Sequence, residues 1–106
     1  MKPLVYYAHR LRDPDPEQQE RNLIRAGQRF FALRAEHEWR GEVLWAPWMD
    51  MARAGSDEEG AWEVIDACIA NSSRVLFDLD GAEVSEGMRT ELQLAKTHGI
   101  ETETRK

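Results

Sequence analysis

The sequence has little cysteine, little positive charge and no long apolar run. The single cysteine, Cys68, excludes an internal disulfide and a zinc site built from cysteines. Cys68 falls on the apolar side of an expected helix, which favours a buried, inert thiol over a nucleophile. Two of the commonest roles of cysteine are therefore absent, and any chemistry has to come from other side chains.

The charge balance argues against a nucleic-acid partner. Acidic residues outnumber basic ones by 20 to 14, and the lysines and arginines are scattered rather than gathered in a stripe. No apolar run approaches the roughly 18 residues that a membrane-spanning helix needs, and no signal peptide precedes the first expected strand. We therefore expect a cytoplasmic protein that binds neither nucleic acid nor membrane.

The chain has 106 residues, which indicates one domain covering residues 1–106. This length can bury a core, but it is short for a sheet that needs cover on both faces. Four tryptophans are many for such a chain, and tryptophan is enriched in interfaces. We expect a homodimer or a larger homo-oligomer.

Apolar runs and helical spacing alternate along the chain. Short runs rich in β-formers predict strands, at residues 4–8, 42–46, 74–79 and 100–104. Apolar residues at helical spacing predict helices, at residues 16–37, 61–71 and 85–98. Residues 48–60 are expected to form a loop with room for one helical turn at 49–54. The alternation predicts a three-layer α/β fold, flavodoxin-like or Rossmann-like, with a mainly parallel sheet in the order 2-1-3-4.

The most informative stretch follows the third expected strand. Ser85 and Gly87 begin a helix, and Glu91 lies in its second turn, on the side of Met88. This places a carboxylate and free helix-start amides at the carboxyl end of a strand, where open α/β sheets bind ligands. Glu91 could be an ordinary solvated helix residue. A carboxylate at the edge of an apolar face is costly unless it is used or paired, which favours a functional site.

The same stretch resembles a known family. Ser-x-Gly-x-x-x-Glu-Leu, followed by Ala95-Lys96 and Gly99-Ile100, is similar to the nucleoside 2-deoxyribosyltransferase superfamily. The closest likeness is to a small branch of uncharacterised domains that carry Ser-Glu-Gly-Met-Arg-x-Glu. The resemblance implies that Glu91 is a nucleophile attacking the anomeric carbon of a deoxynucleoside, and that Tyr6 orients its carboxylate. Such a nucleophile must be ionised, and the nearby helix N-terminus favours the anion.

The resemblance also implies where the rest of a ligand would lie. Ser85 could simply cap the helix, or its hydroxyl and the amides of Gly87 and Met88 could hold a 5′-phosphate. In the loop after the first strand, Arg10 or Arg12 could neutralise that phosphate or could lie in solvent. Ser85 favours a phosphorylated ligand, because members of the resembled family that take free nucleosides often carry an acid at this position.

The main departure from the family concerns a second acid. Active members carry an aspartate eight residues before another aspartate that opens the third strand. Here these positions are Ile65 and Ser73, and the nearest candidate is Asp66, about 100° away around the helix. Without an acid at this place the glycosidic step would lose about 10²–10⁴-fold in rate. Asp66 is kept as a catalytic candidate that would need a local shift.

Three further groups of residues leave alternatives open. Trp48 follows the second strand and could stack on a nucleobase or bury a subunit contact. Asp78 and Asp80 end the third strand and could bind a metal or hydroxyls, but such acids are more often solvent-facing loop residues. The histidines share no ligand spacing, so neither a metal site nor a cofactor is expected.

Three functions compete. The first is an enzyme that cleaves the N-glycosidic bond of a deoxynucleoside or its 5′-monophosphate, by hydrolysis or by transfer to a second base. The second is a non-catalytic module that binds a small nucleoside or nucleotide, and the third is a partner protein with a vestigial site. A hydrogen bond between Tyr6 and Glu91 in an open cleft would weaken the third, and Asp66 in that cleft would favour the first over the second.

Overall fold

A four-stranded parallel sheet forms the centre of the protein, as the sequence predicts. The computed structural model describes residues 2–55 and 58–106, apart from the side chains of residues 53, 54 and 58. Its elements in chain order are β1 (Leu4–Ala8), α1 (Pro16–Trp39), β2 (Val43–Trp45), α2 (Pro47–Ala54), α3 (Glu58–Ala70), β3 (Arg74–Asp78), α4 (Glu86–Thr97) and β4 (Glu101–Arg105). The strand order is β2-β1-β3-β4, which confirms the predicted order and the α/β fold class.

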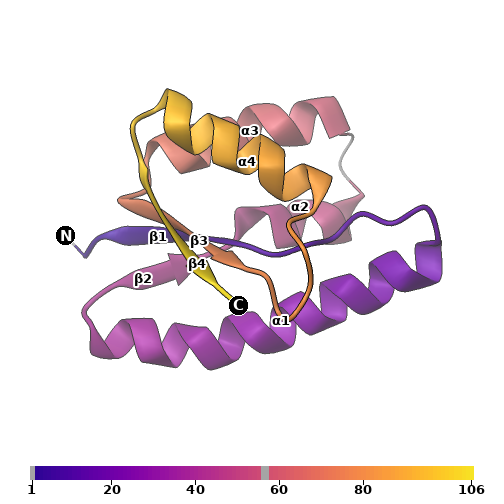
Figure 1. The fold of residues 1–106 in the computed structure, drawn as a ribbon, viewed down its shortest axis with the longest axis horizontal. Coiled ribbons are helices and arrows are strands. Elements are labelled where there is room, and N and C mark those ends of the chain that lie inside the picture. Colours follow the sequence, from indigo (N-terminus) through magenta and orange to yellow (C-terminus); the bar gives the residue numbers. More distant parts are fainter. Residues whose placement is uncertain (1, 56–57) are drawn as a thin grey trace.

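Helices cover both faces of the sheet. The long helix α1 crosses one face, whereas α2, α3 and α4 lie on the other (Figure 1). The two central strands are apolar without alternation because both of their faces are covered. Neighbouring residues of β1 therefore point in opposite directions, and Tyr6 and Tyr7 are both fully buried on different sides of the sheet.

The prediction of a loop over residues 48–60 is wrong for residues 48–54 and 58–60, which are helical. Residues 47–54 form α2, with Pro47 in its first turn and Gly55 as its C-cap at a φ of 73°. Residues 58–60 already belong to α3, and residues 56–57 lie outside the described part of the chain. The helix forms because Trp48 and Met49 bury their side chains in the core, which outweighs the weak local signal of a short segment.

The edge strand β4 is polar, and ion pairs take the place of apolar contacts beside it. Glu103 accepts a hydrogen bond from Arg74 of β3, and Arg105 forms two hydrogen bonds with Glu36 of α1. Charged side chains on an edge strand discourage pairing with a further strand. None of the described helices is both long and apolar enough to cross a bilayer.

Candidate functional site

A cavity of about 600 Å³ opens at the carboxyl ends of β1 and β3, on the side of the sheet that α2, α3 and α4 cover. This volume lies within the usual range for small-molecule sites. Its walls come from the loop after β1, from α2 and α3, and from the first turns of α4. The lining residues used below are His9, Arg12, Asp13, Trp48, Trp62, Ile65, Ser85, Glu86, Gly87, Met88 and Glu91.

Glu91 and Tyr6 meet at the base of this cavity. The Tyr6 hydroxyl donates a hydrogen bond of 2.7 Å to Oε2 of Glu91, across 85 residues of sequence. Glu91 lines the cavity although the residue is only 7% exposed, and Tyr6 lies fully buried behind it. The sequence predicted this pairing through the family resemblance alone, because nothing local to either residue indicates the other.

Burial decides the protonation of Glu91. Loss of hydration raises the pKa of Glu91 to about 8, and the hydrogen bond from Tyr6 offsets only part of this rise. The nucleophile that the resemblance implies must be ionised, and burial opposes the ionisation that a helix N-terminus favours. Burial also raises the pKa of the Tyr6 hydroxyl, and the adjacent Glu91 adds to that rise. The pair therefore holds at least one proton more firmly than either group would in water.

The N-terminus of α4 forms one wall of the cavity. Ser85 is the N-cap, and its Oγ accepts a hydrogen bond of 3.2 Å from the amide of Met88. The capping role of Ser85 is thus confirmed, and Ser85, Gly87 and Met88 also line the cavity. The amides of a first helical turn are ready donors for an anion, so the cap and the anion-binding interpretation remain compatible.

The structure separates the two candidate arginines. Arg12 lines the cavity, whereas the guanidinium of Arg10 donates a hydrogen bond of 3.1 Å to the carbonyl oxygen of Leu79. Arg10 therefore ties the loop after β1 to the loop after β3 and does not reach the cavity wall. The proposed phosphate role of Arg10 loses its geometric basis, and that of Arg12 keeps it.

Asp66 does not enter the cavity. Its Oδ1 lies 2.6 Å from Nε2 of His98 on the outer side of α3 and α4, and Ile65 occupies the corresponding place in the cavity wall. The local shift that would bring Asp66 inward is absent because the helix keeps its phase through these residues. The prediction of Asp66 as a catalytic acid is not supported by this arrangement.

Aromatic side chains form the wall opposite α4. Trp48 and Trp62 line the cavity, and Nε1 of Trp48 donates a hydrogen bond of 2.6 Å to the carbonyl oxygen of Tyr7. Trp48 is buried within the chain and lines the cavity, which favours the interpretation that its ring could stack on a base. The tryptophan that is open to a partner is Trp39, which is 92% exposed at the end of α1. The homodimer itself stays a prediction.

Sequence reasoning missed several polar residues of the cavity. His9, Asp13 and Glu86 line it, together with the predicted Glu91. The position of His9 directly after β1 was a usable signal, because residues that follow the strands of a parallel sheet meet at one edge. Asp13 lies in a loop of irregular conformation, where sequence gives no indication of which way a side chain points.

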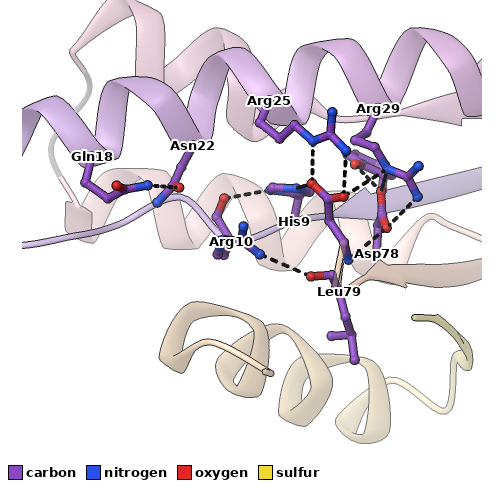
Figure 2. A network of polar contacts seen from close by, with 10 residues as sticks. His9, Arg10, Gln18, Asn22, Arg25, Arg29, Asp78 and Leu79 are labelled. Atoms are coloured by element: carbon purple, nitrogen blue, oxygen red, sulfur yellow. Dashed lines mark hydrogen bonds and ion pairs between the residues drawn. The ribbon is translucent and has the colours of Figure 1, made fainter. Parts of the chain in front are cut away.

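A separate ion-pair network lies behind the sheet edge, toward α1. Figure 2 shows Arg25 and Arg29 reaching from α1 toward His9 and Asp78. Asp78 is 1% exposed. Its carboxylate accepts two hydrogen bonds, of 3.0 and 3.1 Å, from the guanidinium of Arg29 and a third from the hydroxyl of Tyr7. The prediction of solvent-facing acids is therefore wrong for Asp78, since an arginine 49 residues earlier pairs with it. Asp80 binds Arg25 and His9.

Tyr6 and Tyr7 offer a matched pair of variants. The Tyr6→Phe change removes the hydrogen bond that lowers the pKa of Glu91, so that pKa should rise further above about 8. The Tyr7→Phe change removes an equally buried hydroxyl, but Asp78 keeps both bonds from Arg29. Each loss should cost about 1–3 kcal/mol of stability. Unfolding measured against pH should show a shifted Glu91 titration in the Tyr6 variant alone, and equal shifts would contradict the assigned contacts.

No protein-family model, curated protein or solved structure matches the chain.

Proposed function

We propose that the chain binds a deoxynucleoside or its 5′-monophosphate in this cavity and cleaves its N-glycosidic bond, with Glu91 as nucleophile. The observation that carries the proposal is the buried Glu91 carboxyl group, held by Tyr6 at 2.7 Å and lining a cavity of nucleoside size. A structural glutamate would gain nothing from such burial, and perturbed carboxyl groups in clefts cluster at functional sites.

The chemistry would run in two steps. The Glu91 carboxylate attacks C1′ of the sugar, and the bond from C1′ to the base nitrogen breaks with its electron pair leaving on the base. The base then takes a proton, and a sugar ester on Glu91 remains. Water attacks this ester to release the free sugar, or a second base attacks it to form a new nucleoside. Tyr6 keeps the carboxyl group oriented throughout, because it engages Oε2.

The remaining walls match the parts of such a ligand. The amides and the Ser85 hydroxyl at the start of α4 would receive the 5′-phosphate, with Arg12 as a positive group on the same cavity. Trp48 and Trp62 offer aromatic faces for a nucleobase. Asp13 and Glu86 are further carboxyl groups that line the cavity, and the leaving base would take its proton from one of them or from water.

One observation favours a second candidate, a non-catalytic nucleotide-binding module. Ile65 stands in the cavity wall where active members of the resembled family carry an acid, and Asp66 faces His98 instead. A pocket that keeps its phosphate and base contacts without this acid would bind and release its ligand unchanged. The two candidates share the same cavity and differ only in turnover.

Base release distinguishes them. The protein is incubated with a panel of deoxynucleosides and their 5′-monophosphates, and released base is separated by chromatography. Because only the ionised form of Glu91 is a nucleophile, the rate should rise by roughly 25-fold between pH 6.5 and pH 8.5 for a pKa of about 8. Stoichiometric binding of a nucleoside or nucleotide with no released base at any pH would support the non-catalytic binding module. Neither binding nor release across the panel would overturn both candidates.

A further inference from the structure

His9 joins the two loops that border the cavity. It follows β1 in the loop of residues 9–15, lines the cavity and is 4% exposed. Its Nε2 lies 3.2 Å from Oδ2 of Asp80, in the loop of residues 79–85 that leads into α4. The bond from Arg10 to the carbonyl of Leu79 is a second link between the same loops.

Both ring nitrogens of His9 face groups that can only accept a hydrogen bond. Nδ1 lies 2.8 Å from the carbonyl oxygen of Arg10, which has no proton to donate. The Asp80 carboxylate has none either, because its hydrogen bonds from Arg25 hold the pKa of Asp80 well below its usual range. A neutral ring would turn a lone pair toward one of these oxygens. Only the doubly protonated ring donates to both.

His9 lies beside the charged side chains that reach the sheet edge from α1 (Figure 2). Toward α1, Asp80 also receives two hydrogen bonds from Arg25 and lies 3.6 Å from Arg29. The ring of Tyr7 stacks beside the imidazole, with centroids 6.2 Å apart. The charged or titratable groups around His9 are Asp78, Asp80, Arg25, Arg29 and Tyr7 in the network, and Arg12, Asp13, Glu86 and Glu91 line the same cavity as His9.

We propose that His9 is a positioning residue of the cavity, whose imidazolium fastens the loop of residues 9–15 to the loop of residues 79–85. One loop carries Arg12 and the other ends at Ser85, so the contact sets the distance between the two groups that would grip an anionic ligand. The coupling of the loops follows from the contacts themselves. Its effect on nucleotide affinity rests on the proposed function.

Nitrogen NMR of the histidine rings is the first test, with His9→Gln used to assign the signals. The proposal expects both ring nitrogens of His9 to carry protons at pH 7 in the ligand-free protein. A neutral ring in the wild type would overturn the proposal.

Amide exchange measures the coupling of the loops without any ligand. Protection of the loops 9–15 and 79–85 should fall at least about tenfold in His9→Gln, which loses a charged hydrogen bond. His98→Gln is the matched control, since it breaks a histidine–carboxylate pair outside the cavity and should leave both loops protected. Unchanged loop protection in His9→Gln would overturn the proposal.

Nucleotide affinity separates this proposal from the proposed function. If the wild type binds a deoxynucleoside 5′-monophosphate, calorimetry at pH 7 should show at least about tenfold weaker binding in His9→Gln and wild-type binding in His98→Gln. Equal affinity in all three proteins would refute the positioning role. A wild type that binds no nucleotide, yet shows the charged ring and the coupled loops, would refute the proposed function and support the positioning of the loops.

Discussion

The Glu91→Gln protein is expected to lose base release almost completely while it continues to bind nucleotide. Glutamine keeps the size of the side chain and an oxygen that accepts the Tyr6 hydrogen bond, but it cannot attack C1′. Loss of a catalytic nucleophile typically costs about 10⁴-fold or more in turnover. Below pH 8 the wild-type Glu91 is itself mostly neutral, so the two proteins should bind alike at pH 6.5. Chromatography at pH 8.5 and calorimetry at pH 6.5 measure the two properties separately.

Tyr7→Phe is the control for this experiment, since it alters an equally buried group on the other face of β1 without touching the cavity. It should release base at close to the wild-type rate. A Glu91→Gln protein that releases base as fast as the wild type would exclude Glu91 as the nucleophile, and an equal loss in Tyr7→Phe would assign the effect to general damage of the sheet.

Glu91 should also make the protein less stable as the pH rises. Its pKa is about 8 in the folded chain against an ordinary 4.5, so the folded state holds a proton that the unfolded state has lost between these values. The contribution is fully present below about pH 4.5 and disappears as the pH rises through 8, at up to about 1.4 kcal/mol per pH unit. Glu91→Gln removes this titration and should be more stable than the wild type by roughly 3–5 kcal/mol at pH 8.5.

Other groups titrate in the same range, so the difference between the two proteins carries the prediction, and not the wild-type curve alone. Chemical unfolding at closely spaced pH values should give curves that nearly coincide near pH 4.5 and separate steadily above it. If the free energies of unfolding of the wild type and Glu91→Gln changed in parallel with pH, Glu91 would be exposed to water and not buried. A wild type that gains stability over the variant at high pH would reverse the sign and contradict the burial of Glu91.

The strands of the sheet could be predicted because the signal for each strand lies within its own few residues. The runs at Leu4–Ala8 and Arg74–Asp78 are apolar without alternation, which indicates strands covered on both faces. Element bounds then differ by a few residues, as α1 shows by continuing to Trp39 and not ending near His37. The helix α2 escaped prediction because eight residues are too few to show helical periodicity clearly, and it forms through the burial of Trp48 and Met49.

The site was predictable only in part, because its properties depend on contacts between distant residues. The family resemblance indicated the pairing of Tyr6 with Glu91, but only the folded chain shows how completely Glu91 is dehydrated. Helix phase decides between Ile65 and Asp66 at the cavity wall, and one residue of misalignment reverses the answer. The pairing of Asp78 with Arg29 likewise requires the fold, since α1 must lie across the end of β3.

The most direct test of the central claim is a search for the sugar ester on Glu91. The wild-type protein is incubated with a deoxynucleoside 5′-monophosphate at pH 8.5, quenched rapidly in acid and analysed by intact-protein and peptide mass spectrometry. We predict an added mass equal to the sugar phosphate, located on the peptide that contains Glu91 and absent from Glu91→Gln. Base release without any adduct on that peptide, or an adduct on another residue, would contradict the account.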